Sequence, residues 1–216
     1  MNTLELFAGS RSFSKVAESL GHKVYTTDNQ NFERIDQVCD IFDFDINKIP
    51  YEPEIIWASP PCTSFSVASI GHHWNPDHTP KTEKAELGVA IVKKTIEIIN
   101  YLKPKYWFIE NPRGKLRKLD FIQDLNRTTV CYCKYGDMRM KPTDIWTNFL
   151  YEPNLCNGWK PREMCFNGNK NCHHEPAPRG SKTGTQGLKG DYLRSQIPAE
   201  LFIDIFNDIK KINNDI

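Results

Sequence analysis

The feature that most constrains this chain is the alternation of short apolar runs with longer segments of helical periodicity. The apolar runs predict strands at residues 4–7, 23–27, 38–42, 55–58, 106–109, 129–133 and 144–149. Residues 82–102 and 199–212 repeat apolar side chains at helical spacing, and Pro104 and Pro198 bound these helices. Such alternation is typical of a mostly parallel sheet with helices on both faces. We therefore predict an α/β fold.

The length of 216 residues is enough for one substantial core and short for two. No long apolar stretch occurs, which argues against a membrane span or a signal peptide, and seven cysteines favour reduced thiols over a disulfide framework. We therefore expect a cytoplasmic protein. The net charge of +1 does not indicate a nucleic-acid partner, but residues 139–189 carry eight Lys and Arg against four Asp and Glu. This excess suits an anionic partner or a solvated loop.

Two segments do not fit the alternating pattern. Residues 63–81 predict a long loop without secondary structure, and such loops are usually lids or binding segments. Residues 150–192 are rich in Gly, Pro, Asn, Cys and His, so they need a partner or a metal to become ordered. We therefore expect a core at 1–149, an insert at 150–192 and a helix at 193–216 that returns to the core.

Pro60, Pro61 and Cys62 directly follow the predicted strand at 55–58. Two prolines fix φ at successive positions, so the thiol that follows is held in one direction. An α/β enzyme places a nucleophile at such a strand end. A free cysteine can equally be a small buried hydrophobe, so this tripeptide alone leaves both interpretations open.

Other strand ends also carry polar groups. Phe7, Gly9 and Ser10 follow the first predicted strand and precede a helix-compatible segment, a turn where a cofactor can approach the backbone. Asp28 ends the second predicted strand and Asp40 lies near the third; both can bind a nucleotide or cap a turn.

The strand at 106–109 runs into Glu110, Asn111 and Pro112. A glutamate at a strand end beside a thiol can act as an acid or a hydrogen-bond donor if burial raises its pKa. The alternative is that Glu110 caps a loop.

Three ordered segments together resemble the cytosine-C5 DNA methyltransferases. They are LELFAG at 4–9, SPPCTSFS at 59–66 and IENP at 109–112, similar to the cofactor loop, the nucleophile motif and the glutamate-asparagine motif of that family. The resemblance covers most of residues 3–149 and implies a Rossmann-like, S-adenosylmethionine-dependent methyltransferase fold. It is closest to small, phage-like or bacterial forms with a minimal target-recognition region, here residues 150–192.

The resemblance implies a role for each matching residue. Cys62 would add to C6 of cytosine and Glu110 would contact N3, in a base flipped out of a DNA duplex. Ser66 in the lid and Asn111 would lie near this base. The expected S-adenosylmethionine contacts are Phe7, Gly9, Ser10, Asp28, Asp40 and Pro60. We expect a monomer that binds DNA and no membrane.

The chain departs from the family pattern at three places. Where the family has a glutamine and two alternate arginines, this chain has Arg139, Lys141 and Thr143, so Lys141, with Arg139 beside it, is expected near the cytosine. Lysine lacks the planar fork of arginine, which puts the contact geometry in doubt. Pro112 replaces a valine, and Ser10-Arg11-Ser12 replaces a more glycine-rich loop.

Cysteines and histidines in the insert predict a compact Cys3His zinc site made of Cys156, Cys165, Cys172 and His174. Free thiols with surface histidines are the alternative. Two other functions also stay open: an RNA cytosine-C5 methyltransferase acting on tRNA, and a catalytically silent nucleic-acid-binding relative.

Overall fold

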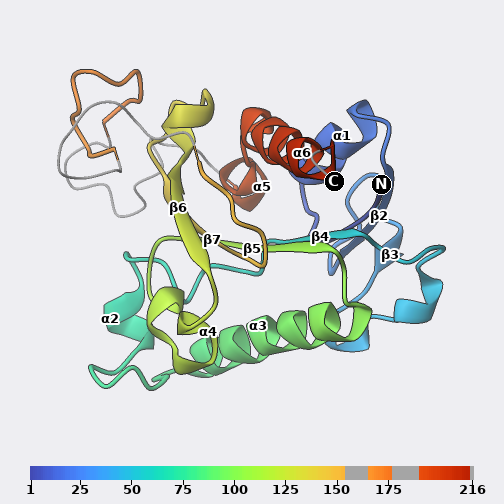
Figure 1. The fold of residues 1–216 in the computed structure, drawn as a ribbon. Helices are drawn as coiled ribbons and strands as arrows, with labels where there is room; N and C mark the ends of the chain where they lie inside the picture. The colour runs from blue at the N-terminus through green and yellow to red at the C-terminus, as the bar shows by residue number, and fades with distance from the viewer. Residues whose placement is uncertain (154–164, 177–189, 215–216) are drawn as a thin grey trace.

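The computed structural model describes residues 1–153, 165–176 and 190–214. In this part of the chain, a curved seven-stranded sheet has the order β3-β2-β1-β4-β5-β7-β6 (Figure 1). The strands are β1 (Asn2–Leu6), β2 (Lys23–Asp28), β3 (Gln37–Val38), β4 (Ile55–Ala58), β5 (Tyr106–Pro112), β6 (Arg127–Cys131) and β7 (Pro142–Thr147). The α/β class predicted from the apolar pattern is confirmed.

The order in which successive strands are added to the sheet reverses beside β1. The chain adds β2 and β3 on one side of β1 and then crosses over to add β4 on the other side. Strand β1 pairs in parallel with β2 on one side and with β4 on the other, and β4 pairs in parallel with β5. Only β7 runs against its neighbours β5 and β6. In open α/β sheets, ligands bind outside the carboxyl ends of the strands at such a reversal point. The loops after β1 and β4 lie there.

One predicted strand is mostly replaced by a tight turn. A strand was expected over residues 38–42, but β3 ends at Val38 and a 3-10 turn follows at Ile41–Asp43. The carboxylate of Asp40 accepts a hydrogen bond from the amide of Phe42, which caps this turn. A short polar side chain that bonds its own backbone competes with strand pairing, and the periodicity alone did not show it.

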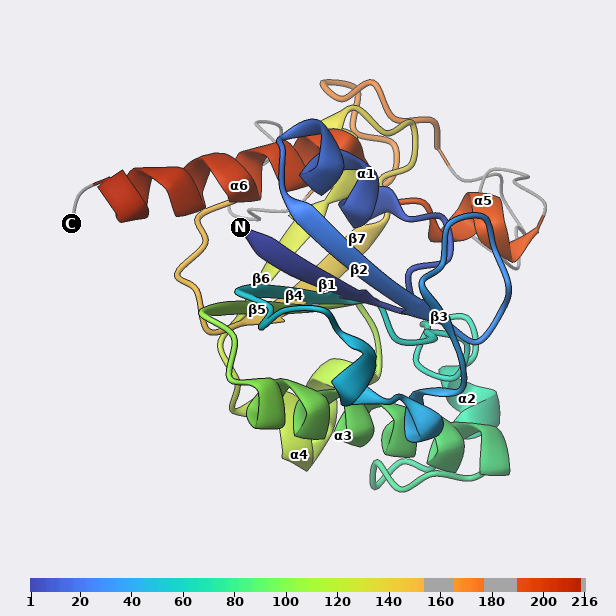
Figure 2. The same ribbon diagram turned by 90° about the vertical axis from the view of Figure 1, so that its right-hand side faces the viewer.

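Helices cover both faces of the sheet (Figures 1 and 2). On one face lie the long α3 (Glu83–Leu102) and the short α4 (Asp120–Gln123). Thr82 caps α3 by accepting a hydrogen bond from the amide of Ala85. On the other face lie α1 (Ser12–Ser19) and α6 (Ala199–Asn214), with α5 (Asp191–Ser195) leading into α6. The two helices expected at 82–102 and 199–212 are confirmed.

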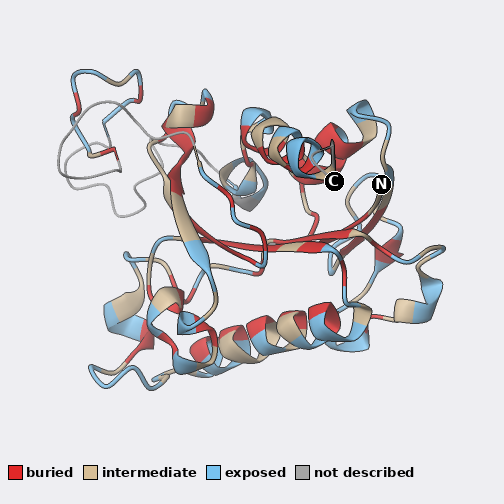
Figure 3. Ribbon diagram, in the orientation of Figure 1, coloured by how far each residue is buried: buried red, intermediate tan, exposed pale blue. Residues whose placement is uncertain are grey.

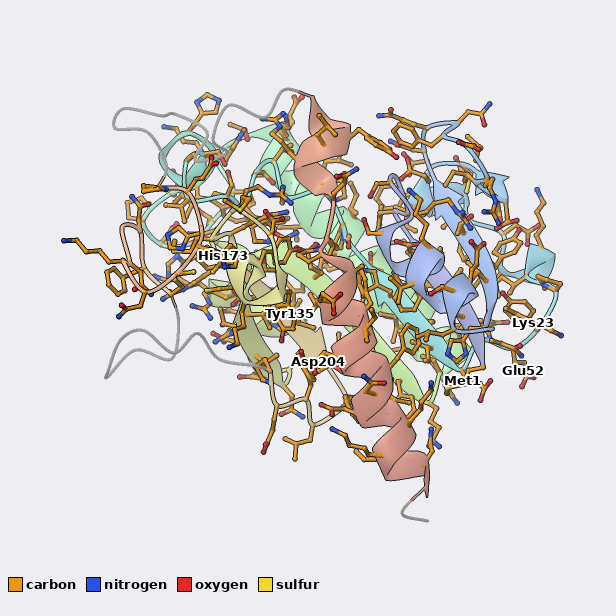
Figure 4. All side chains as sticks on the ribbon, turned by 90° about the horizontal axis from the view of Figure 1, so that it is seen from above. Met1, Lys23, Glu52, Tyr135, His173 and Asp204 are labelled. Atoms are coloured by element: carbon orange, nitrogen blue, oxygen red, sulfur yellow. The ribbon has the colours of Figure 1, made fainter. Side chains whose placement is uncertain are left out.

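The C-terminal helix packs on the core through aromatic and polar contacts. Phe202 lies edge-on to Trp57 with ring centroids 4.8 Å apart, and both side chains are fully buried. Tyr151 donates a 2.8 Å hydrogen bond to Asp204 of α6, and the hydroxyls of Tyr135 and Tyr151 lie 2.6 Å apart. Figure 4 shows Tyr135 beside Asp204. These contacts fix α6 over the segment that follows β6.

The segment at 63–81 has more structure than the sequence indicated. It contains α2 (Ile70–His73) and a bridge between Trp74 and Pro80, and Phe65 and Trp74 are buried. A Cβ added at Gly114 would lie 2.2 Å from the carbonyl oxygen of Phe65, so only glycine allows this close approach. The expectation of a structureless loop is therefore wrong, because Phe65 and Trp74 belong to the core cluster on the α3 side of the sheet. Figure 3 shows buried stretches in the ribbon on this side of the sheet.

Within the described ranges, no helix combines the length and the apolar character needed to span a membrane.

Candidate active site

The turn that carries Cys62 follows β4 at the carboxyl edge of the sheet. Pro60 is buried and Cys62 is partly exposed. The carbonyl oxygen of Cys62 accepts hydrogen bonds from the amides of Phe65 and Ser66, at 3.0 and 3.1 Å. The buried side chain of Phe65 anchors the far end of this turn. The thiol is therefore held between a rigid proline pair and an anchored helical turn.

Asn111 joins the Cys62 turn to the neighbouring strand. Its side-chain amide donates a 2.9 Å hydrogen bond to the carbonyl oxygen of Pro60, and the residue is fully buried. Its Oδ1 is also buried and has no partner among the described residues. Since Asn111 follows Glu110 in β5, one hydrogen bond fixes the distance between the thiol turn and the carboxylate strand.

Glu110 is a buried carboxylate whose orientation is set by a tyrosine. The hydroxyl of Tyr132 donates a 2.9 Å hydrogen bond to Oε1 of Glu110, and both residues are buried. Burial, and then the neighbouring carboxylate, raise the pKa of Tyr132 well above its ordinary value. The phenol therefore stays protonated and acts as the donor. Sequence reasoning did not identify Tyr132, because an aromatic residue after a strand has no distinctive signature.

Cys62, Glu110 and Lys141 interact electrostatically. Burial raises the pKa of the Cys62 thiol; the Lys141 ammonium partly counteracts this, and Glu110 adds to it. Burial also lowers the pKa of Lys141, while Glu110 and Cys62 raise it. The structure thus brings together three of the residues that the sequence placed at the target base, with a cation beside the thiol.

Lys141 is held in an unusual backbone conformation. Its φ is +27°, which L side chains rarely adopt, and its ammonium donates a 3.2 Å hydrogen bond to the carbonyl oxygen of Arg194. The same ammonium lies 4.7 Å from the centre of the Tyr132 ring. Such strain persists only where surrounding contacts fix the residue, and it is concentrated at functional sites.

Arg139 has a different environment from the one expected. Its guanidinium pairs with the carboxylate of Asp137 and donates to the carbonyl oxygens of Arg194 and Gln196 at 3.1 and 3.0 Å. The residue is buried. These bonds occupy its planar fork, so Arg139 holds the backbone around residue 194 and thereby positions Lys141.

The turn after β1 has an unusual backbone. Phe7, Gly9 and Arg11 have φ values of +60°, +45° and +55°. The amide of Gly9 donates a 2.9 Å hydrogen bond to Oδ2 of Asp28, whose Oδ1 accepts from the amide of Gln30. A carboxylate has about four acceptor sites, so Asp28 can still accept ribose hydroxyls.

The substitution of the glycine-rich loop now has a structural description. Arg11 occupies a left-handed position that suits glycine, and its guanidinium pairs with Glu18 at 2.6 Å. Ser10 is buried, and its hydroxyl lies 2.8 Å from that of Ser12. The turn therefore keeps its shape through side-chain contacts where the family pattern relies on glycines.

The remaining predicted residues also have definite positions. Asp40 is exposed at the carboxyl edge of β3, where it caps the turn at Ile41–Asp43. The hydroxyl of Ser66 lies 3.0 Å from that of Ser69, at the start of the 63–81 segment. Pro112 is the last residue of β5 and lies opposite Thr143 of β7.

The structure revises the predicted set of metal ligands. Cys165, Cys172 and His174 lie together as expected, and Cys133 is the fourth member of their cluster. Cys156 lies outside the described residues. Cys133 belongs to the 3-10 turn η4 (Tyr132–Tyr135), directly after β6. Its spacing of 32 residues from Cys165 gave no recognisable zinc-binding pattern; the only available signal was the excess of cysteines.

Comparisons with known proteins agree with this geometry. The strand order and the polar groups at the reversal point define a Rossmann-like methyltransferase. A family model for C-5 cytosine-specific DNA methylases matches residues 1–127. A curated protein of frog virus 3 (isolate Goorha), named "Probable DNA (cytosine-5)-methyltransferase", is 30% identical over 96% of this chain and 99% of its own. The chain belongs to the C-5 cytosine-specific DNA methylase family.

Solved structures share the fold at low sequence identity. A prophage-encoded DNA modification methyltransferase of E. coli aligns over 68% of this chain with 15% identity and a TM-score of 0.51. The Dnmt2 methyltransferase of S. pombe aligns over 71% with 12% identity and a TM-score of 0.45. This chain spans 46% and 51% of the lengths of those two chains, respectively.

Proposed function

We propose that this chain transfers a methyl group from S-adenosylmethionine to C5 of cytosine in DNA through a covalent bond between Cys62 and C6. The observation that carries the proposal is the placement of Cys62 beside the buried carboxylate of Glu110 and the partly buried ammonium of Lys141 at the carboxyl edge of the sheet. Family membership supports the reaction class.

Each polar group in the site has a separate task in this mechanism. The thiolate of Cys62 adds to C6, and Glu110 hydrogen-bonds N3, which stabilises the enamine whose C5 becomes nucleophilic. Lys141 favours the thiolate form of Cys62 and thereby counteracts the burial that raises the pKa of the thiol. Loss of the C5 proton after methyl transfer allows elimination, which restores the thiolate.

The cofactor site that we propose consists of the turn after β1 with Asp28, Asp40 and Pro60. The turned backbone at Phe7 and Gly9 and the remaining acceptor capacity of Asp28 suit an adenosine moiety. When bound, S-adenosylmethionine supplies the electrophilic methyl group. Phe7, Gly9 and Ser10 would contact it from the backbone side, with Asp28 toward the ribose and Asp40 toward the adenine amino group.

The DNA partner is proposed to bind with its target cytosine flipped out of the duplex. Attack on C6 approaches the ring from its face, which stacked neighbours cover. The 63–81 segment adjoins the Cys62 turn and carries the partly buried Ser66, and we propose that it is the lid. We propose that residues 150–192 recognise the target sequence and that the enzyme acts as a monomer.

A labelling experiment tests the proposed substrate. The protein is incubated with tritiated S-adenosylmethionine and cytosine-containing duplex DNA, with tRNA as a parallel substrate. We expect label in DNA, at C5 of cytosine. Label in tRNA alone would make the chain an RNA methyltransferase, and no label in either polymer would make it a silent binding protein.

A trapping experiment tests the nucleophile. DNA containing 5-fluorocytosine blocks the final elimination, so the active enzyme should form an adduct that survives denaturation. Cys62→Ser should form none, while Cys39→Ser, a control that directly follows β3 and is separated from β4 by β2 and β1, should form the wild-type amount. An adduct with Cys62→Ser would disprove the assignment.

Zinc is the second cofactor expected from the sequence, and its proposed role is structural. Three thiolates and one imidazole fill all four positions of tetrahedral zinc and leave none for water or substrate. We therefore assign zinc no part in methyl transfer.

A further inference from the structure

A dense cluster of metal-ligating side chains lies where the insert meets the core. Its members are Cys133, Cys165, Cys172 and His174, and their ligand atoms all lie within 4.8 Å of one another. All are buried except Cys172, which is partly buried. Cys133 comes from η4 of the core, and the other three come from residues 165–176 of the insert.

We propose that these four residues bind one Zn²⁺ and that this ion fastens the insert to the core. The ligand set differs from the one expected from sequence, which lay entirely within the insert and used Cys156. With Cys133 as a ligand, the metal becomes a crosslink between two regions that are distant in sequence.

The geometry of the cluster suits tetrahedral coordination. Zn–S and Zn–N bonds of about 2.3 and 2.0 Å at tetrahedral angles separate a sulfur from a nitrogen ligand by about 3.5 Å. The Sγ of Cys165 and the Nδ1 of His174 lie 3.5 Å apart. The side-chain amide of Asn169 donates a 3.4 Å hydrogen bond to the Cys165 sulfur. A hydrogen bond of this kind supports and orients a thiolate ligand.

His174 gives an independent reason to expect a ligand here. The residue is only 5% exposed, and its Nε2 is buried without a hydrogen-bond partner among the described residues. A buried imidazole without full hydrogen bonding costs free energy. Coordination of a metal through Nδ1, the atom beside the Cys165 sulfur, would explain why a polar ring is buried among sulfur atoms, and it would leave Nε2 as the protonated nitrogen.

Backbone contacts continue the junction on one side of the cluster. The amide of Glu175 donates a 2.9 Å hydrogen bond to the carbonyl oxygen of Met138. The side-chain Nε2 of His173 lies 3.1 Å from the backbone carbonyl oxygen of Asp137. Figure 4 labels His173 on this side of the molecule. The ion would therefore fix residues 165–176 against the segment that leads from η4 to Lys141.

The position of Cys133 in η4 connects the metal to the active site. Tyr132, its immediate neighbour, donates the hydrogen bond that orients Glu110. The metal would thus hold the insert and restrain the turn that carries Tyr132. This functional part rests on the proposed methyl transfer, whereas the metal site itself does not.

Metal analysis of the full chain gives the first test. Protein purified without chelators should contain about one zinc per chain. After removal of zinc, titration with Co²⁺ alone should give the intense visible bands of tetrahedral cobalt and a thiolate charge-transfer band that corresponds to three sulfur ligands. Metal-free folded protein would overturn the proposal, and so would an octahedral cobalt spectrum.

Cysteine alkylation identifies the ligands without any substitution. Native protein is treated with iodoacetamide before and after chelation, and mass spectrometry locates the modified residues. Cys133, Cys165 and Cys172 should become reactive only after chelation, while the reactivity of Cys62 should be the same in both samples. Protection of Cys156 by metal, with Cys133 unaffected, would restore the set expected from sequence and overturn ours.

Matched variants separate the ligand from its neighbour. Cys133→Ser should lose most of the zinc, while Cys131→Ser, at a buried cysteine in the same sulfur cluster but outside the ligand set, should retain it. Full zinc content in Cys133→Ser would contradict the proposal. Because these readouts are metal content and thiol reactivity, they stay informative even if the protein methylates no DNA.

Discussion

The proposed active site and the proposed metal site are held together in different ways. Cys62 and Glu110 lie at the ends of β4 and β5, whose pairing in register, Ala58 beside Ile109, brings the two strand ends to one edge. The metal-ligating residues have no such framework, since three of them come from residues 165–176, which form no helix or strand. The backbone hydrogen bonds of paired strands position the first site, whereas isolated turn hydrogen bonds, one backbone contact from Glu175 to Met138 and the ligand side chains bring the second together.

This difference explains which functional residues short motifs can identify. A motif at a strand end has its spatial neighbours fixed by the sheet, so a few residues indicate a site. In a segment without regular structure, sequence spacing carries little spatial information. The comparison predicts that substitutions at the proposed active site will lower the rate of methyl transfer without preventing folding. Substitutions at the proposed metal site should lower both the rate and the stability of the fold.

The largest effect on activity short of removing the nucleophile should come from Glu110→Gln. Loss of the carboxyl group at N3 should lower kcat by about 10²- to 10⁴-fold, the usual contribution of a positioned acid or base. The folded state should persist, because glutamine can still accept the hydrogen bond from Tyr132. Single-turnover methylation and circular dichroism measure the two quantities. A drop below tenfold would remove Glu110 from the chemistry.

The next largest effect concerns Glu5 of β1, whose carboxyl group should make the free energy of unfolding depend on pH. Burial raises the pKa of Glu5 to about 7 even though the amides of Phe13 and Ser14 donate to it. The folded state therefore binds a proton more tightly than the unfolded chain. The stability contributed by neutral Glu5 is fully present below about pH 4.5 and is lost as pH rises to about 7, by up to about 3 kcal/mol.

Glu5→Gln should remove this dependence. Urea unfolding at several pH values should show the variant gaining stability relative to wild type between about pH 4.5 and 7, with no further change above that range. Glu33→Gln, at an exposed position, is the control. A constant difference between Glu5→Gln and wild type across this range would contradict the raised pKa.

Tyr132→Phe tests the link between the two sites. Removal of a hydrogen bond to a buried carboxylate costs about 1.5–3 kcal/mol, so kcat should fall about ten- to hundredfold if Glu110 loses its orientation. Zinc content should stay unchanged, because Cys133 is retained. Cofactor affinity, measured by calorimetry, should also be unaffected. Loss of zinc from this variant would show that the turn as a whole had been disrupted.

The smallest expected effect is a shift in the pH dependence of kcat when Lys141 is replaced. Lys141→Met removes the cation that lowers the pKa of Cys62, so the rise of kcat with pH should move upward by about one unit. Lys141→Arg keeps the charge and should leave this limb near its wild-type position. An unchanged profile in Lys141→Met would exclude an electrostatic role for the ammonium.

Much of the fold followed from the apolar pattern because buried parallel strands and amphipathic helices have strong periodic signals. Two deviations from this pattern, and one from the site expected by resemblance, have local causes. Asp40 caps a turn where a strand was expected, Phe65 and Trp74 bury the supposed open loop, and Asp137 pairs with Arg139, which was expected near the cytosine. Each depends on one side chain meeting a particular partner, which periodicity does not encode.

The segment from Arg194 to Ile197 has contacts on two sides. Its Arg194 and Gln196 carbonyls accept from Arg139 and Lys141, while the amide of Ile197 donates to Ser12 at the start of α1. The segment 194–197 therefore borders both the turn after β1, which is part of the proposed cofactor site, and Lys141, the cation beside Cys62. We therefore expect a substitution at Ser12 to shift the pKa of the Cys62 thiol through this segment and Lys141, and a survey of active-site variants should include it.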